Sequence, residues 1–253
     1  MAVIKTENLT YVYGEGTPFR KTAVDNVNIE INDGEMVGII GHTGSGKSTL
    51  IQHFNGLLKP TSGSVYIDGE RLWDDKSRLR PIRFKVGLVF QYPEHQLFEV
   101  DVISDVCFGP KNQGLSEEES EKNAREALEL VGFPEKYYKQ SPFELSGGQK
   151  RRVAIAGVIA MRPKCIVLDE PTAAIDPLEE TRVYKKFAEI AKENTAIIVT
   201  HRLGSCRIAD RIAVMDSGEL AELGTHDELM QNNGLYREMW DAQSEWLNGS
   251  GSE

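Results

Sequence analysis

The chain has 253 residues, a formal net charge of −10 at pH 7, 40% hydrophobic residues and 27% charged residues. This is ordinary globular usage, and the length suits one large α/β domain or one domain with a small inserted lobe. The negative charge argues against broad nucleic-acid binding, and no apolar run reaches the ~18 residues of a membrane-spanning helix. Three widely spaced cysteines suit a reducing compartment, and we expect no secretory leader.

The N-terminal segment predicts short strands. Residues 3–6, 9–13 and 23–31 alternate apolar and polar side chains, which is typical of an antiparallel sheet. Tyr13 ends the second of these runs, just before a glycine-containing loop. Its ring could stack on a base, an interaction that contributes about 1–3 kcal/mol, or it could be a half-buried strand aromatic.

Residues 36–49 combine an apolar strand, a glycine loop and the start of a helix. The loop is Gly41-His42-Thr43-Gly44-Ser45-Gly46-Lys47-Ser48-Thr49, which fits the phosphate-loop pattern G-x-x-x-x-G-K-[ST]. Its glycines permit positive φ and allow successive backbone N–H groups to surround a phosphate. Lys47 would supply a mobile charge for the β- and γ-phosphates, and Ser48 a hydroxyl for Mg²⁺. The flanking strand and helix favour this interpretation over a glycine-rich turn that only caps a helix.

A second apolar strand and a helical lobe follow. Residues 86–90 predict a buried parallel strand that delivers Gln91 to its carboxyl end, although a glutamine is also common in loops. Residues 92–142 predict a mainly helical lobe with a capping box over 116–119. The predicted organisation is a core of residues 1–91 and 143–247, a lobe of residues 92–142 and a flexible tail of residues 248–253.

Three further segments carry chemistry. The pentapeptide Leu145-Ser146-Gly147-Gly148-Gln149 opens a helix and predicts either a second anion site or a plain N-cap. The strand 164–168 ends in Asp169, which suits Mg²⁺, and Glu170, placed to polarise a water; a general base typically contributes ~10²–10⁴ in rate. These acids could instead cap the next helix, predicted over 178–192. The strand 195–200 ends at His201, a candidate γ-phosphate contact, although a lone histidine is more often structural.

In this order, the phosphate loop, the pentapeptide, the run from Cys165 to Glu170 and His201 resemble the nucleotide-binding ATPase subunit of ABC transporters, over essentially the whole chain. The resemblance implies a fold of the α/β class: a P-loop NTPase core with a mainly parallel sheet, an N-terminal antiparallel β subdomain and an inserted helical lobe. It implies ATP and Mg²⁺ as cofactors.

The resemblance also implies roles for single residues. Tyr13 would stack on adenine, and residues 41–49 would wrap the phosphates. Ser146 and Gly148, with their neighbours, would bind the γ-phosphate of ATP held by the opposite subunit, and Asp176 would pass contacts across the dimer. The implied catalytic residues are Lys47, Gln91, Glu170 and His201; the implied metal ligands are Ser48, Gln91 and Asp169; the implied ATP-binding residues are Tyr13, Gly41, His42, Thr43, Gly44, Ser45, Gly46, Lys47, Ser48, Thr49, Ser146, Gly147, Gly148, Gln149 and Asp176.

The resemblance further implies partners: a second ATPase subunit, identical or different, and an integral membrane transport subunit, with no nucleic acid. The chain would lie in the cytoplasm, peripheral at the inner face of the cell membrane. ATP binding would close the dimer, hydrolysis would open it, and the membrane partner would be moved.

Two parts of the chain resemble different subfamilies. Residues 91–98, 108–110 and 150–161 resemble the ATPases of energy-coupling-factor (ECF) importers of vitamins and metal ions. Several segments after Thr172 resemble ABC exporters, among them 200–205, 209–211, 222–229 and 234–236. We therefore hypothesise a recombinant or designed hybrid, with residues 1–170 of ECF type and residues 172–247 of exporter type; a natural divergent member is the alternative.

Two functions other than transport stay open. One is a soluble ABC-type ATPase in repair, translation or cofactor assembly, a class that usually carries coiled-coil insertions, tandem cassettes or basic patches. None of these is visible in the sequence. The other is a recombined ATPase domain that folds but has no native membrane partner.

Overall fold

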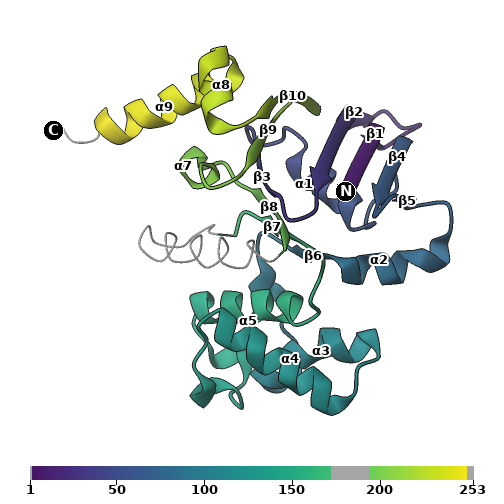
Figure 1. Cartoon of the computed structure of the whole chain (residues 1–253), viewed down its shortest axis with the longest axis vertical. Coiled ribbons are helices and arrows are strands. Elements are labelled where there is room, and N and C mark those ends of the chain that lie inside the picture. Colours follow the sequence, from purple (N-terminus) through teal and green to yellow (C-terminus); the bar gives the residue numbers. More distant parts are fainter. Residues whose placement is uncertain (1, 172–193, 250–253) are drawn as a thin grey trace. The chain divides into compact units, whose positions relative to one another are not determined.

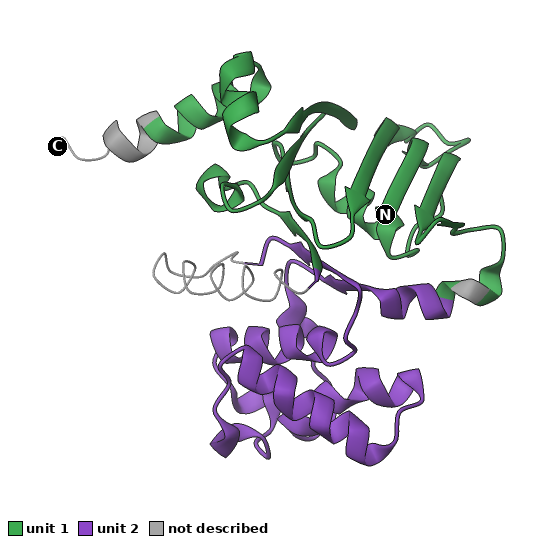
Figure 2. Ribbon diagram, in the orientation of Figure 1, with its two compact units in different colours: residues 1–79, 195–253 green, residues 80–194 purple. Residues whose placement is uncertain are grey.

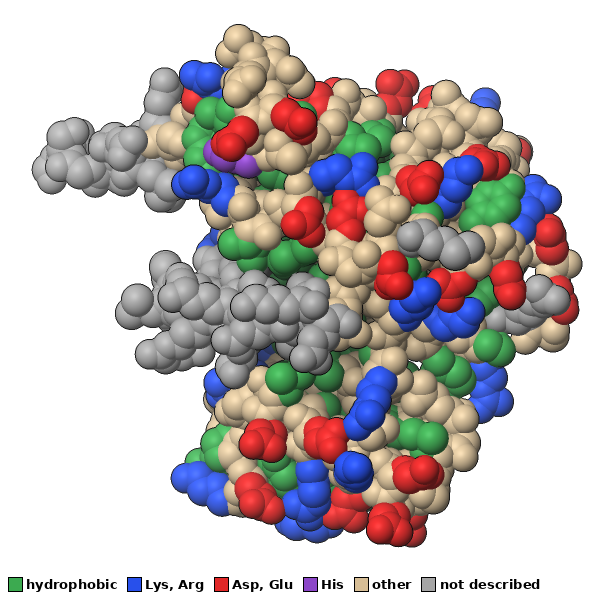
Figure 3. Space-filling model, in the orientation of Figure 1, with side chains coloured by type: hydrophobic (Ala, Val, Ile, Leu, Met, Phe, Trp, Pro, Cys, Tyr) green, Lys and Arg blue, Asp and Glu red, His purple; other side chains and the backbone are tan. Residues whose placement is uncertain are grey.

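The computed structural model describes residues 2–171 and 194–249. The chain divides into two compact units, residues 1–79 with 195–253 and residues 80–194 (Figure 2). On the face drawn in Figure 3, acidic and basic side chains are interspersed over both units.

The first unit contains an antiparallel sheet with the strand order β2-β1-β4-β5 (Figure 1). Its strands are β1 (Ala2–Tyr13), β2 (Lys21–Asn32), β4 (Ser62–Ile67) and β5 (Glu70–Arg71). The sequence predicts two short strands where β1 is continuous. The break in alternation comes from an irregularity: the register with β2 shifts between Thr6 and Leu9, and Asn8 has a φ of 48°.

The same unit contains parallel strands. β3 (Met36–Ile40) pairs in parallel with β8 (Thr195–Val199) on one side and β9 (Arg211–Asp216) on the other. Every residue of β3 and β8 is buried, which explains their unbroken apolar runs. β10 (Glu219–Gly224) pairs antiparallel with β9 and forms a hairpin with it.

The helices of this unit are α1 (Lys47–Phe54), α7 (Leu203–Cys206), α8 (His226–Asn232) and α9 (Leu235–Gly249). Tyr236 is fully buried and packs with Leu203, Leu229 and Ile212 in one cluster, which fixes α8 and α9 to the sheet.

The second unit contains two buried parallel strands, β6 (Val86–Val89) and β7 (Cys165–Asp169). α2 (Leu79–Lys85), preceded by the 3-10 turn η1 (Lys76–Arg78), leads into β6. The helices between the strands are α3 (Val102–Gln113), α4 (Glu117–Leu130) and α5 (Gly147–Ile159). The 3-10 turn η2 (Pro93–Gln96) lies between β6 and α3, and the turns η3 (Glu135–Tyr137) and η4 (Pro142–Glu144) lie between α4 and α5.

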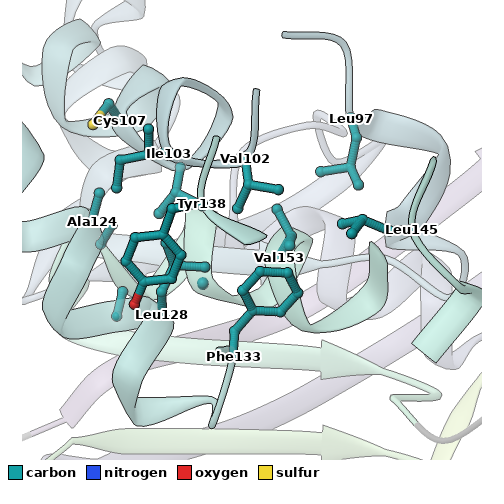
Figure 4. Packing of buried hydrophobic residues seen from close by; sticks show 14 residues of the cluster. Leu97, Val102, Ile103, Cys107, Ala124, Leu128, Phe133, Tyr138, Leu145 and Val153 are labelled. Carbon is teal, nitrogen blue, oxygen red and sulfur yellow. The ribbon is translucent and has the colours of Figure 1, made fainter. Parts of the chain in front are cut away.

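One apolar cluster holds these helices together (Figure 4). Phe133 and Tyr138, which follow α4, are stacked with ring centroids 6.3 Å apart. They pack with Leu128 of α4 and with Val153 of α5, so the helical core includes α5 beyond residue 142. The lobe boundary at 142 stays a prediction. The predicted capping box is confirmed, because Ser116 and Glu119 exchange side chain–backbone hydrogen bonds at the start of α4.

Some predicted features lie outside the described residues. These are the helix 178–192, Asp176 and the last four residues of the predicted tail. Asn248 and Gly249, the first two residues of that tail, belong to α9. Among the described helices, none combines the length and apolar character needed to span a membrane.

Candidate functional site

Glycine shapes the loop between β3 and α1. Gly41, Gly44 and Gly46 have φ values of 148°, 84° and 99°, all in the region that favours glycine. A Cβ on Gly41 would lie 2.2 Å from the carbonyl oxygen of Met215, and a Cβ on Gly46 would lie 2.2 Å from that of Ala23. No larger residue fits at Gly41 or Gly46, as the phosphate-loop pattern requires.

Lys47 begins α1 and folds back over the loop. Its Nζ donates hydrogen bonds of 2.8 Å to the carbonyl oxygens of Gly41 and of His42, and the residue is only 8% exposed. Gly46 precedes the helix, and among the described residues no side chain caps the first turn of α1. The N–H groups at this end of α1 can therefore bind an anion.

A pocket of about 190 Å³ lies against the loop. It is lined by Tyr13, Lys21, Ala23, Gly44, Gly46, Lys47, Ser48 and Thr49. Tyr13 is 43% exposed, and its hydroxyl lies 3.4 Å from Thr49 Oγ1. The Tyr11 ring packs edge-on against the Tyr13 ring, with centroids 4.8 Å apart, and against the His53 ring, with centroids 5.0 Å apart. One side of the Tyr13 ring is therefore packed against another aromatic ring.

Sequence reasoning missed Lys21 and Ala23 as pocket residues. Lys21 is the Cα partner of Tyr13 in the β1–β2 ladder. Local sequence does not determine the register between two strands that are joined by a long loop. Only the strand pairing in the structure therefore identifies Lys21 as a pocket residue.

His201 lies on the same edge of the parallel sheet as the loop. β3 and β8 run in parallel, and the Thr200 N–H donates to the Ile39 carbonyl oxygen at 3.1 Å. His201 comes directly after Thr200, and its own carbonyl oxygen accepts a hydrogen bond from Gln243 of α9. A histidine at this strand end is placed as the sequence predicts, while its role in catalysis stays a prediction.

In the second unit, Gln91, Asp169 and Glu170 gather at one sheet edge. β6 and β7 are parallel, with Val89 opposite Leu168, so the residues after both strands lie at the same end. Asp169 is only 5% exposed, and Glu170 adopts a left-handed backbone with φ 50°. Non-glycine residues adopt this conformation only rarely.

Arg151 of α5 holds the Gln91 backbone. Its Nη2 donates to the Gln91 carbonyl oxygen at 2.6 Å, and its Nε lies 3.6 Å from a carboxylate oxygen of Glu94. Arg151 is 5% exposed, so a buried guanidinium joins α5 to the segment that follows β6. No local sequence pattern singles out Arg151.

The pentapeptide forms an N-cap. Ser146 Oγ accepts from the Gln149 N–H at 3.3 Å, and Gln149 Oε1 accepts from the Ser146 N–H at 2.9 Å. A Cβ on Gly147 or Gly148 would meet no heavy atom within 4 Å. Packing among the described residues therefore does not require glycine at either position, whereas close approach of a ligand or partner would.

The predicted metal ligands are a hydroxyl (Ser48), an amide (Gln91) and a carboxylate (Asp169), the oxygen donors that Mg²⁺ prefers. Ser48 belongs to the first unit, and Gln91 and Asp169 belong to the second. No group of three or more His, Cys, Asp or Glu residues in the described part of the chain could hold a metal by itself. Oxygen donors of these kinds suit a Mg²⁺ ion that also binds phosphate oxygens, and the assignment of these three residues stays a prediction.

Comparisons with known proteins agree with this geometry. A family model described as "ABC transporter" matches residues 24–173. The energy-coupling factor transporter ATP-binding protein EcfA2 of Caldanaerobacter subterraneus is 53% identical over 231 residues, covering 90% of this chain and 81% of that protein. EcfA2 of Clostridium perfringens is 52% identical over 242 residues, covering 92% of this chain and 85% of that protein.

Solved structures give the same fold. CbiO1 of Clostridium perfringens, part of the ABC transporter complex CbiONQ, has a TM-score of 0.80 and 37% identity over 96% of this chain and 99% of its own. A dimeric ATP-binding cassette bound to ADP and Pi has a TM-score of 0.80 and 34% identity, covering 88% of this chain and 98% of its own. A bacterial Atm1-family ABC exporter with ATP bound has a TM-score of 0.79 and 29% identity, covering 95% of this chain and 41% of its own. The predicted fold class is confirmed.

The EcfA2 matches bear on the hybrid hypothesis. Covering 90% and 92% of the chain, they continue through positions 171–173, where the hypothesis places a join. The comparisons give no support to a hybrid, which stays a hypothesis.

Proposed function

Because this chain belongs to the ABC transporter ATP-binding family, we propose that it binds ATP and hydrolyses it to drive import through an integral membrane partner of the ECF type. The observation that carries the proposal is the phosphate loop, in which two glycines cannot be replaced and Lys47 lies over the loop at the start of α1. Relatives named as energy-coupling factor transporter proteins support the choice of partner.

Nucleotide binding uses the first unit. The adenine stacks on the exposed Tyr13 ring, and the N–H groups of the loop and of the first turn of α1 surround the phosphates. Lys47 donates to two loop carbonyl oxygens, which place its ammonium at the loop that surrounds the phosphates.

Hydrolysis needs a base and a charged environment around the γ-phosphate. Glu170 accepts a proton from the attacking water at its carboxylate, and His201 donates a hydrogen bond to the γ-phosphate. Ser48, Gln91 and Asp169 would hold Mg²⁺, which when bound offsets the charge of the phosphates. The Arg151–Gln91 hydrogen bond positions the Gln91 side chain by fixing its backbone.

A second subunit completes each site. Ser146 and Gly148 of one subunit bind the γ-phosphate of ATP held by the other, and Asp176 passes contacts across the interface. The two glycines that packing does not require support this assignment. Resemblance to a cassette solved as a dimer with ADP and Pi supports it as well.

The membrane partner contacts the segment after β6 and the helical lobe of residues 92–142. The chain would then lie at the cytoplasmic face of the cell membrane. Here the resemblance to CbiO1, which is part of the transporter complex CbiONQ, is the supporting observation.

The test is co-expression with an ECF-type transmembrane subunit, with an exporter membrane domain as control. We expect co-purification with the ECF subunit only, and ATP hydrolysis that changes when the subunit is present. Hydrolysis without capture by either partner would favour a soluble ABC ATPase or an uncoupled domain. Preference for the exporter domain would contradict the ECF assignment.

A further inference from the structure

Lys21, the first residue of β2, lines the pocket beside the phosphate loop. Its Cα partner in the antiparallel β1–β2 ladder is Tyr13. Residues directly opposite each other in such a ladder project to the same face, with Cβ atoms about 4.5–5.5 Å apart. The Lys21 side chain therefore starts beside the aromatic ring to which we assign the adenine.

Ala23 lines the same pocket, at the end of the segment 21–23 that lies next to the phosphate loop. The β1–β2 register shifts here, because Val12 pairs with Thr22 while Tyr11 pairs with Val24. At this irregularity the Ala23 carbonyl oxygen lies so close to the loop that a Cβ on Gly46 would be 2.2 Å from it. Residues 21–23 thus run from the Tyr13 ring to the phosphate loop.

The pocket has a basic lining. Of its eight lining residues, two are lysines and none is acidic, in a chain whose net charge is −10. The Lys47 ammonium donates to loop carbonyl oxygens. Within residues 2–171 and 194–249, no hydrogen bond or ion pair engages the Lys21 ammonium, which sits on a flexible four-carbon stem.

We propose that Lys21 is a nucleotide-binding residue whose ammonium contacts the α-phosphate, an inference that rests on the proposed ATP site. Lys21 starts at the Tyr13 end of the pocket, whereas Lys47 lies over the loop that takes the β- and γ-phosphates. The part of the nucleotide between base and β-phosphate is the same in ATP and ADP. Lys21 therefore strengthens binding of both nucleotides equally and leaves the chemical step unchanged.

The experiment measures ATP and ADP affinity by titration calorimetry for wild type, Lys21→Met, Lys21→Arg and Arg20→Met. Methionine keeps the length of the stem without the charge. Arg20 is the adjacent exposed cation and does not line the pocket, so Arg20→Met controls for loss of one positive charge. We expect Lys21→Met to weaken both nucleotides about tenfold, and the other two variants to stay within about twofold of wild type. The KM for ATP should rise by a similar factor in Lys21→Met, while Arg20→Met, outside the pocket, should keep the wild-type KM and turnover.

Each other outcome overturns the inference in a distinguishable way. Equal affinities for Lys21→Met and Arg20→Met would remove Lys21 from the site and leave the proposed function intact. Weakened ATP binding with unchanged ADP binding would move the contact to the γ-phosphate. A wild-type chain that binds neither nucleotide would overturn both the proposed function and this inference. Because Lys21 is exposed at a strand end, thermal denaturation should show that all three variants fold.

Discussion

The imidazole of His42 and the carboxylate of Asp216 lie 2.9 Å apart, measured between Nε2 and Oδ1, although the two residues are 174 positions apart in the chain. The other ring nitrogen of His42 lies 2.8 Å from the Thr43 carbonyl oxygen. Gly218, in the same hairpin turn as Asp216, donates its N–H to the Ser45 carbonyl oxygen at 3.1 Å. The β9–β10 turn therefore holds the phosphate loop at two points.

This relationship predicts the effect of Asp216→Asn. The two side chains are 57% and 46% exposed, so their pair stabilises the loop by no more than about 1 kcal/mol. We expect ATP affinity to fall by about two- to fivefold, measured by calorimetry. Asp241→Asn, which breaks the exposed Arg237–Asp241 pair on α9, is the matched control. If both variants bind ATP equally well, the His42–Asp216 pair does not set the shape of the loop.

The second prediction concerns Glu170→Gln. An amide cannot accept the proton from water, so turnover should fall by ~10²-fold or more, while ATP still binds. Phosphate release measures turnover, and calorimetry measures binding. Glu118→Gln on the exposed face of α4 removes the same charge elsewhere and should leave turnover unchanged. Wild-type turnover in Glu170→Gln would assign the base to another residue.

The third prediction tests backbone geometry with Gly46→Ala. The added methyl group would meet the Ala23 carbonyl oxygen at 2.2 Å on a backbone with φ 99°, so both steric clash and strain act. Together they should lower the free energy of unfolding by about 2–4 kcal/mol and abolish ATP binding. Gly16 has a comparable φ of 79°, and no heavy atom of the described residues lies within 4 Å of a Cβ added there. Gly16→Ala therefore isolates the backbone strain. Equal urea midpoints for the two variants would rule out the clash.

A buried histidine gives the fourth prediction. Burial lowers the pKa of His53 from 6.5 to about 4, while its Nδ1 donates to the Thr49 carbonyl oxygen. The unfolded chain binds a proton at this residue at higher pH than the folded chain does. Its contribution to stability is therefore complete above pH 6.5 and is lost as pH falls from there to about 4.

The size of the effect follows from the shift, which corresponds to about 3 kcal/mol. His53→Gln keeps a donor for Thr49 but does not titrate, so its urea stability should decline less between pH 7 and 4. A His53→Gln slope identical to wild type would show that His53 is not the titrating group.

The sequence predicted the elements that have strong local patterns. β3 and β8 are recognisable because both faces are buried, and the loop after β3 because glycine positions are sterically fixed. No helix was predicted over α2, although proline in a first helical turn replaces no hydrogen bond.

Long-range contacts of the site could not be predicted. Lys21 reaches the pocket through strand register, and Asp216 reaches His42 through a hairpin that lies late in the chain. Neither relationship leaves a local pattern. The same holds for the Arg151 hydrogen bond to Gln91, which depends on how α5 packs.

The last prediction concerns the ATP-dependent dimer. Gly148 lies in the first turn of α5, where no heavy atom of the described residues lies within 4 Å of an added Cβ. Gly148→Asp should therefore fold normally and keep its own phosphate loop intact. In a closed dimer it would place a carboxylate against the γ-phosphate of the partner's ATP, and like charges in close contact are strongly unfavourable. Gly157, on the same helix, also has no neighbour within 4 Å of an added Cβ.

Light scattering of Glu170→Gln with Mg·ATP should report a dimer, because ATP stays bound without being hydrolysed. Adding Gly148→Asp should leave a monomer at micromolar concentration, and adding Gly157→Asp should leave the dimer. ATP affinity of the monomeric double variant, measured below the dimer concentration range, should stay within about twofold of Glu170→Gln, since nucleotide binding uses the first unit. A dimer that persists in the Gly148→Asp variant would place the γ-phosphate contact across the interface on residues other than the pentapeptide.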